Sequence, residues 1–192
     1  MKAMKPVRMS LTRQVLSVME SYLQEGHWAV GDRIPPEPEL AKAFSVSHNT
    51  VREALQSLIH AGILEARLAL EKEIARLAAT NHRKEDLLLL EKTLAKCHER
   101  NGTGIEDDMN FHAAVATATH NPVLAQLYSV IINYLRENLE ALLEEKQYED
   151  SAMQLHADLL DAIRSHDADA AEAIIIKIVD FDTVSIRDNQ KK

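Results

Sequence analysis

The sequence predicts a mainly α-helical protein, in which an N-terminal helix-turn-helix precedes an all-helical antiparallel bundle. Apolar residues recur at helical spacing in one segment after another, and from Leu68 onward no strand-like alternation competes with this pattern. Before that point, two short helical segments joined by a two-residue turn are typical of a helix-turn-helix. The 192 residues leave room for two modest domains, which we place at residues 1–66 and 67–192.

The helix that begins after Ser47 is the most informative segment. Ser47 is placed to cap its N-terminus. One apolar stripe follows at helical spacing, formed by Val51, Ala54, Leu55, Leu58 and Ile59. The opposite face carries side chains that donate or accept hydrogen bonds, namely His48, Asn49, Thr50, Arg52, Glu53 and Gln56. A face of this kind suits a groove of DNA.

The rest of the head follows from capping and turn signals. In chain order we expect a helix over 11–23, a short extended segment around Trp28, a helix that begins at Pro36 or Pro38, and a turn at Ser45-Val46. Gly62 is predicted to end the helix that follows the turn, and Ile63-Leu64-Glu65 to begin a strand.

These residues resemble a known DNA-reading head. The run from Val30 to Ala41, together with Val46-Ser47 and Val51-Arg52-Glu53-Ala54-Leu55, resembles the winged helix-turn-helix of the GntR family of bacterial repressors. The resemblance covers about residues 10 to 66 and implies double-stranded operator DNA as a partner. The contacts that we predict from it are His48, Asn49, Thr50, Arg52 and Arg33.

The chain departs from that family pattern at three places. Pro38 and His48 stand where the family has arginines that contact DNA, so contact here depends more on Arg52, Asn49 and Thr50. The family also places a wing of two strands and a helical linker where this sequence has only Ala66 between Glu65 and Arg67. We therefore expect that residues of a wing and linker are missing between the two segments near Ala66-Arg67, and a deletion is the competing explanation.

The body is expected to consist of helices only. The predicted helices lie at about 70–78, 87–97, 105–119, 122–142, 151–165 and 168–184. Asp108 and His112 are four residues apart, so a helix places both on one face, where they could bind one metal ion together with His156 from another helix. Spacing alone favours an interpretation without a metal, in which Asp108 belongs to an acidic helix N-terminus and the two histidines only form hydrogen bonds.

The body also resembles a known sensor domain. The matching fragments are Arg67-x-x-x-Glu71 with Ala78-Ala79, Asp108-x-x-x-His112 with Asn121-Pro122, His156-x-x-Leu159-x-x-Ala162-Ile163 and Asp167-x-x-Ala170-Ala171. They resemble the FCD ligand-sensing domain of the FadR subfamily of GntR regulators over about residues 67 to 185. The resemblance implies a small organic acid as effector, and its metal-binding members use one Asp and three His.

The resemblance makes Asp108, His112 and His156 the expected ligands of a divalent metal such as Zn, Ni or Mn. The last family histidine would fall near Ile178, so we expect weakened metal binding here. A carboxylate held directly by Arg67 or Lys177, if Lys177 points inward, is then an equal alternative. We predict Arg67, Asn121 and Lys177 as ligand-binding residues.

Charge and composition agree with nucleic acid binding by the head alone. Residues 1–67 carry eight basic and seven acidic side chains, a net +1, whereas the whole chain is −8, which leaves −9 for the rest. Basic residues at Lys2, Lys5, Arg8 and Arg13 do not repel phosphates as the acidic body does. No apolar run is long enough to span a bilayer, and the single Cys97 cannot form an intramolecular disulfide. We expect a cytoplasmic protein with no membrane partner.

The sequence thus predicts a non-enzymatic transcriptional regulator that binds operator DNA as a homodimer, because one recognition helix makes too few contacts for a long operator. Two alternatives remain open. One is a metal-dependent hydrolase that uses Asp108, His112 and His156, with Asp107 as its general base. The other is a scaffold protein that has lost DNA binding, which Pro38 and His48 would favour.

Overall fold

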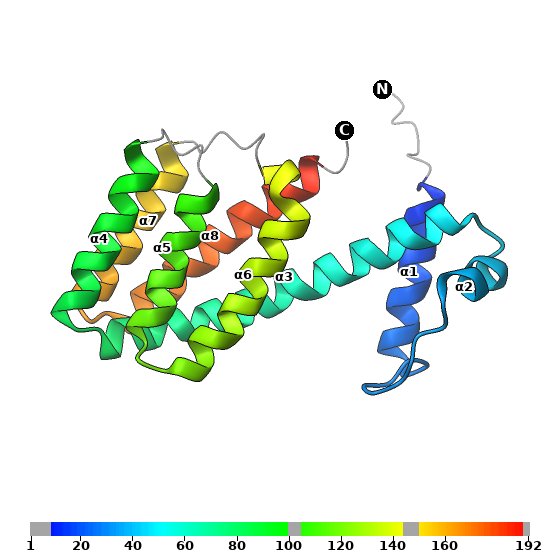
Figure 1. Cartoon of the computed structure of the whole chain (residues 1–192), viewed down its shortest axis with the longest axis horizontal. Helices are drawn as coiled ribbons and strands as arrows, with labels where there is room; N and C mark the ends of the chain where they lie inside the picture. The colour runs from blue at the N-terminus through cyan, green and yellow to red at the C-terminus, as the bar shows by residue number, and fades with distance from the viewer. Residues whose placement is uncertain (1–8, 100–104, 144–149, 190–192) are drawn as a thin grey trace, which may run out of the picture. The chain divides into compact units, whose positions relative to one another are not determined.

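The computed structural model describes residues 9–99, 105–143 and 150–189, and the regular secondary structure within them is entirely helical (Figure 1). The helices are α1 (Leu11–Gln24), α2 (Glu37–Phe44), α3 (His48–Asn81), α4 (Lys84–Glu99), α5 (Ile105–Ala118), α6 (Pro122–Leu143), α7 (Asp150–Arg164) and α8 (Ala168–Asn189). The chain forms two compact units, Met1–Ile63 and Leu64–Lys192. Their boundary lies three residues before the one that we predicted.

The first unit is a helix-turn-helix head, as predicted. Ser10 caps α1 by accepting a hydrogen bond from the Arg13 N–H at 3.2 Å, and Pro36 precedes α2. Ser45 ends α2 in the left-handed conformation (φ 55°), which turns the chain into α3. Six buried residues form the core of the head: Val15, Met19, Leu40, Ala41, Val51 and Ala54.

Two expectations for the head are wrong. The segment around Trp28 consists of turns and bends without a strand. The helix after the turn does not end at Gly62 but continues to Asn81, so 63–65 is helical and Leu64 is buried. A glycine inside a helix costs only about 1 kcal/mol, and the leucines, alanines and charged residues around it are good helix formers.

The continuous helix also decides between the two explanations for the missing wing. Residues 65–67 are consecutive within α3, so the prediction that residues are missing there is wrong. The join left by a deletion is the explanation that agrees with the structure. No β wing is present among the described residues.

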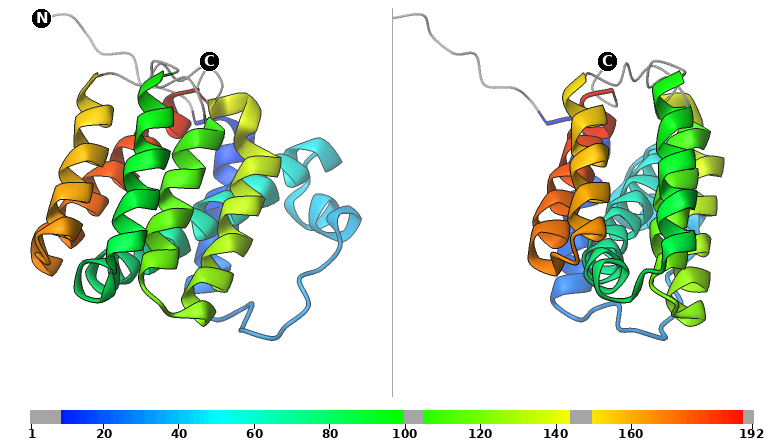
Figure 2. Two further views of the ribbon diagram at one scale, coloured as in Figure 1. Left: turned by 60° about the vertical axis from the view of Figure 1, so that its left-hand side comes forward. Right: turned by 90° about the vertical axis from the view of Figure 1, so that its left-hand side faces the viewer.

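The second unit is the predicted helical bundle. Within it, α4, α5 and α6 pack side by side, α7 packs against α8, and α4 contacts α7. The C-terminal part of α3 lies between these two groups (Figure 2). Its residues Ile74, Ala75, Ala78 and Ala79 are almost fully buried. Because α3 is central to the bundle, its polar residues there are placed inside the protein.

None of the described helices has the length and the apolar character that crossing a membrane would require.

The turns at one end of the bundle are held by polar side chains. Asp86 accepts a hydrogen bond from the Arg83 N–H at 2.7 Å, the return half of a capping box at the start of α4, and pairs with His120 at 2.7 Å. Burial raises the pKa of Asp86, but the Arg83 N–H and His120 lower it more, so the pKa lies below its usual value.

We expect Asp86→Ala to lower the free energy of unfolding by about 1 kcal/mol at neutral pH, because two hydrogen bonds to the carboxylate are lost. A lowered folded-state pKa stabilises the protein above the unfolded-state pKa, and this contribution disappears as the pH falls through the folded-state value. Urea unfolding over a pH series should therefore show the difference between wild type and variant shrinking in acid. A difference that stays constant with pH would contradict this role, and Glu85→Ala is the neighbouring control.

Candidate functional site

The structure brings the three predicted metal-binding residues together. Asp108 and His112 project from α5 and His156 from α7, and one ligand atom of each lies within 4.8 Å of the others. The His156 Nε2 atom is 2.9 Å from the Asp108 Oδ1 and 3.3 Å from the His112 Nε2, and the His112 Nε2 is 3.9 Å from the same Asp108 oxygen. Both histidines are buried.

These separations fit a divalent metal ion. Two donor atoms about 2.1 Å from one ion, at angles between a right angle and the tetrahedral angle, are about 3.0–3.4 Å apart. The 2.9 and 3.3 Å separations are close to this range, and the 3.9 Å separation needs a wider angle. Two imidazole nitrogens and a carboxylate oxygen suit Zn, Ni or Mn. Without an ion, the same contacts are hydrogen bonds and ion pairs within the triad.

A buried carboxylate lies directly behind this cluster. The Glu71 Oε1 accepts hydrogen bonds from the Arg67 Nε at 2.7 Å and from the Tyr128 hydroxyl at 2.6 Å. Burial raises the pKa of Glu71, but Arg67 and His112 lower it more, to about 2, so Glu71 is an anion. Burial and the charge of Glu71 raise the pKa of Tyr128 well above its usual value, so Tyr128 is a neutral donor.

Glu71 also lies beside one histidine of the cluster, His112. Its Oε2 lies 3.3 Å from the His112 Nδ1, within ion-pair distance. A carboxylate at this position favours a proton on Nδ1, which leaves the lone pair of Nε2 facing Asp108 and His156. The same arrangement orients histidine ligands in many metal sites.

Arg67 was predicted to bind the carboxylate of the effector, but in the structure it pairs with Glu71. Arg67 is buried and bound to Glu71, so it is already paired inside the protein. The spacing of four residues on one helix was the available signal for this pair. Tyr128, 57 positions from Glu71, could not be identified from local spacing.

The other two predicted ligand-binding residues do not join the cluster. Asn121 is exposed, and its Oδ1 caps α6 by accepting hydrogen bonds from the Val123 and Leu124 N–H groups at 3.1 and 3.2 Å. Lys177 is exposed on α8, whereas its neighbour Ile178 is buried. The expectation that Lys177 points inward is therefore wrong.

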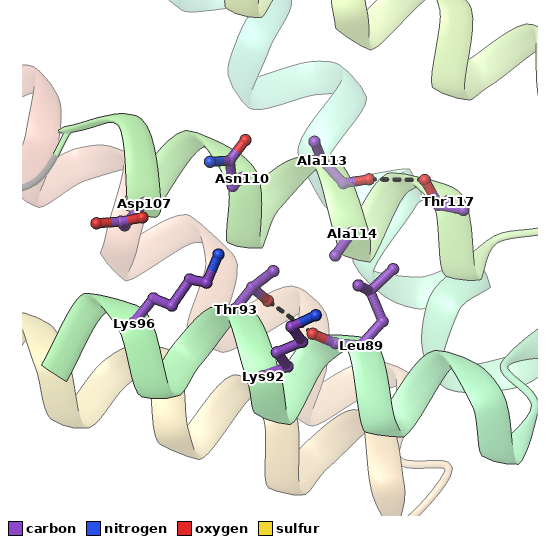
Figure 3. A pocket seen from close by; sticks show the side chains of 9 residues that line it. All are labelled: Leu89, Lys92, Thr93, Lys96, Asp107, Asn110, Ala113, Ala114 and Thr117. Carbon is purple, nitrogen blue, oxygen red and sulfur yellow. Dashed lines mark hydrogen bonds between the residues drawn. The ribbon is translucent and has the colours of Figure 1, made fainter. Parts of the chain in front are cut away.

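A surface groove lies between α4 and α5, separate from the cluster (Figure 3). Its volume is about 340 Å³, and Asp107 and Lys96 lie at one end of it. Asp107, the general base of the hydrolase alternative, thus lines a different surface from the one that Asp108 reaches. None of the three cluster residues lines the groove.

The predicted DNA-contacting residues lie on the surface of the head. His48, Asn49 and Arg33 are exposed, and Thr50 is partly buried. Ser47 caps α3 as predicted, since its Oγ accepts a hydrogen bond from the Thr50 N–H at 3.1 Å. The basic residues Lys2, Lys5 and Arg8 lie outside the described residues.

Arg52 is exposed, but it is paired within the head. Its Nη2 is 2.9 Å from the Glu37 Oε2, and its Nε is 3.3 Å from the Glu37 Oε1. The hydrogen bond from Arg52 lowers the pKa of Glu37, so this carboxylate stays charged. Sequence reasoning did not identify this pair, because Glu37 and Arg52 lie on different helices.

Two family profiles match the chain. The profile described as "FCD domain" matches residues 62–181, and the profile described as "Bacterial regulatory proteins, gntR family" matches residues 11–68. The two matches overlap at residues 62–68, so no separate linker lies between them.

Curated relatives and solved structures are similar to the chain over most of its length. The galactonate operon transcriptional repressor of Escherichia coli (strain K12) is 26% identical over 227 aligned positions, which cover 92% of this chain and 97% of the repressor. The HTH-type transcriptional repressor NanR of Edwardsiella tarda (strain FL6-60) is 25% identical, covering 86% of this chain and 81% of the relative. The solved structure of E. coli McbR/YncC has a TM-score of 0.59 and 20% sequence identity, covering 95% of this chain and 99% of that one, and shows the shared fold.

The alignment with the galactonate operon repressor also shows a difference in length. Since 92% of 192 residues is about 177, about 50 of the 227 aligned positions have no residue from this chain. The relative is therefore longer than this chain within the aligned region.

Proposed function

Because the chain belongs to the gntR family of bacterial regulatory proteins and is a ligand-responsive, DNA-binding transcriptional regulator with an FCD domain, we propose that a small organic acid bound at the Asp108, His112 and His156 cluster modulates its binding to operator DNA. The observation that supports this most directly is the convergence of these three side chains in front of the buried Glu71 anion. One relative is named as the transcriptional repressor of a galactonate operon, and galactonate is a sugar acid.

The cluster explains how an acid would be recognised in an acidic body. Asp108, His112 and His156 would hold a divalent ion, which supplies the positive charge that an effector carboxylate needs. Three protein ligands leave coordination positions for such a carboxylate or for water. Glu71, Arg67 and Tyr128 hold His112 in the tautomer that this binding requires.

Direct capture of the acid by a protein cation has less support. Arg67 is already bound to Glu71, and Lys177 is exposed. A metal-mediated effector site therefore agrees better with the described residues.

We also propose that two copies bind one operator. The head presents one recognition helix, and its described residues include no wing that would add contacts. Two heads related by a two-fold axis would read two half-sites about one helical turn of DNA apart.

The function as a whole is tested by fluorescence anisotropy with labelled DNA from upstream of the protein's own gene, at two salt concentrations. Binding that exceeds binding to scrambled DNA and weakens with salt is expected for a regulator. Adding sugar acids and short hydroxy acids, with and without a chelator, should change the affinity only when metal is present. If the protein binds no DNA at all, the scaffold alternative is supported. If the organic acids still change the DNA affinity in the presence of chelator, the metal-mediated site is contradicted.

Arg52→Ala is expected to weaken operator binding by about 1–3 kcal/mol, because Arg52 is the basic residue on the exposed face one turn into α3. The matched variant is Glu37→Gln, which frees Arg52 and removes a negative charge from the same surface. We expect it to strengthen binding, and both variants should keep wild-type circular dichroism. Unchanged affinity of a folded Arg52→Ala variant would exclude Arg52 as a contact.

A further inference from the structure

Two lysines line the surface groove between α4 and α5. Lys92 and Lys96 are four residues apart on α4, so they lie on one face of that helix, on the α4 side of the groove (Figure 3). Within the part of the chain that the structure describes, no ion pair joins either lysine to a carboxylate. Two positive charges are therefore available to a ligand that enters the groove.

Three other basic residues of the bundle, by contrast, are held by carboxylates. Lys72 and Arg76 both pair with Glu172, at distances of 3.2 and 2.9 Å. Arg136 pairs with Glu106 at 2.9 Å. Residues 68–192 carry a net charge of −9, so most of this surface repels an anion. The lysine pair in the groove is a local exception, at which an anion can bind.

The groove has the size and the lining of a small-molecule site. Its volume of about 340 Å³ lies at the lower end of the range of about 300–1,000 Å³ that is usual for ligand pockets. Leu89, Ala113 and Ala114 supply apolar surface to its lining, on which a carbon skeleton can pack. Apolar walls with a few polar groups that fix the orientation of the ligand are typical of such sites.

The uncharged polar groups of the groove favour a ligand that carries hydroxyl groups. Thr93 donates its hydroxyl hydrogen to the Leu89 carbonyl at 3.0 Å, and Thr117 donates to the Ala113 carbonyl at 2.9 Å. The oxygen lone pairs of both threonines therefore remain to accept hydrogen bonds. Asn110 is exposed in the groove, and its amide can donate and accept. Ligand hydroxyl groups can form hydrogen bonds with all three side chains.

We propose that this groove binds a phosphorylated sugar or polyol, with its phosphate between Lys92 and Lys96. A phosphate monoester carries a charge of about −1.5 to −2 near pH 7, which matches two ammonium groups better than the single charge of a carboxylate does. None of the three cluster residues lines the groove, so this site is separate from the proposed effector site. The regulator then has two ligand sites of different chemistry.

Isothermal titration calorimetry of the full chain with glucose 6-phosphate tests the proposal. A chelator is present throughout, so that no metal ion at the cluster binds the phosphate. Wild type should bind glucose 6-phosphate. The double variant Lys92→Gln with Lys96→Gln should bind it about 10-fold more weakly or worse, because charge-assisted hydrogen bonds to the phosphate are lost. A wild type that does not bind glucose 6-phosphate would overturn the proposal.

A matched double variant controls for net charge. Lys84→Gln with Lys177→Gln removes the same charge from exposed positions of the bundle that do not line the groove. Because distant surface charges are screened by salt, the affinity for glucose 6-phosphate should change by less than about 2-fold. Equal weakening in the two double variants would show that the bulk charge of the protein, and not the groove, attracts the phosphate.

Three further ligands test the chemical class. Glucose lacks the phosphate, succinate replaces it with two carboxylates, and inorganic phosphate lacks the hydroxylated skeleton. Each of them should bind more weakly than glucose 6-phosphate. Equally tight binding of glucose or succinate would overturn the assignment to a phosphate, and equally tight binding of inorganic phosphate would overturn the assignment to a sugar or polyol.

A second pair of variants tests the place of binding without changing any charge. Ala113→Phe fills the groove but keeps both lysines, so binding of glucose 6-phosphate should be lost. Ala95→Phe adds the same side chain at an exposed position of α4 outside the groove lining, and this variant should bind like wild type. Both variants should keep wild-type circular dichroism. Undiminished binding by Ala113→Phe would overturn the proposal.

His156→Ala separates this site from the proposed effector site. The variant removes a residue of the cluster and none of the groove, so it should bind glucose 6-phosphate like wild type. Loss of binding in a folded His156→Ala variant would place the phosphate at the cluster and overturn the groove site. Because these titrations contain no DNA, their outcome does not depend on the proposed control of operator binding.

Discussion

Replacing Arg67 with alanine is expected to lower the free energy of unfolding by roughly 3–5 kcal/mol, because the buried Glu71 carboxylate would lose the cation bound to it. Glu71 and Arg67 are both almost completely buried, so water cannot substitute for the lost hydrogen bond. Urea unfolding followed by circular dichroism measures the change. We attribute this loss of stability to the Glu71 carboxylate that is left buried without its cation, and not to the removal of the arginine side chain itself.

Two control variants separate these causes. Arg76 lies on the same helix and pairs with Asp169 and Glu172, but its side chain is 39% exposed, so Arg76→Ala should destabilise the protein much less than Arg67→Ala. The double variant Arg67→Met with Glu71→Leu removes both charges and should be much less destabilised than Arg67→Ala alone. An Arg67→Ala variant that is as stable as Arg76→Ala would show that Glu71 does not depend on Arg67.

His156→Ala is expected to lower the affinity for divalent metal by more than about 100-fold, because the described residues offer three ligands at this cluster and each would bind the proposed ion directly. Elemental analysis of the purified wild type should find about one Zn, Ni or Mn ion per chain. The measurement is a competition titration with a chelator of known affinity, supported by the metal-dependent shift in Tm.

The metal-binding experiment has two further variants, one at a histidine outside the cluster and one at the carboxylate beside His112. His166→Ala removes an exposed histidine that stacks on His82, outside the cluster, and should bind metal like wild type. Glu71→Gln keeps the shape but removes the anion beside His112, and should lower the affinity by about 10–100-fold. Wild type that binds no metal, with variants that change only stability, would show that the cluster is a hydrogen-bonded triad.

Helices and their starts could be predicted well from sequence, because capping and periodicity are local signals. Ser47 and Pro122 begin helices where expected, and the helices from α4 to α8 agree closely with the apolar repeats. The predicted helix at 70–78 is not separate but forms part of α3. The end of α3 could not be predicted in this way. A glycine ends a helix only where the chain must turn, and without a wing no strand was available for residues 63–65 to pair with.

The candidate site could be predicted only in part, for similar reasons. Asp108 and His112 share a helical face by spacing, whereas the convergence with His156 was expected mainly from the family resemblance. Lys177 lies in a run of isoleucines whose apolar pattern surrounds the helix, so the side that faces inward could not be read from it. The contact of Tyr128 with Glu71 depends on tertiary packing.

If Arg52 contacts DNA as proposed, its ion pair with Glu37 should affect how quickly the head finds its operator. Any stretch of DNA offers phosphates to Arg52, but Glu37 competes with them for the guanidinium. The free energy gained in a chance contact with the DNA backbone is therefore reduced by the free energy lost when the ion pair with Glu37 breaks. An operator adds contacts to base edges that random sequence does not provide. Genomes hold about 10⁶–10⁹ non-specific sites. A head that dissociates sooner from each non-specific site spends less time bound to non-operator DNA. By weakening these contacts, the Glu37 carboxylate would shorten the time needed to find the operator.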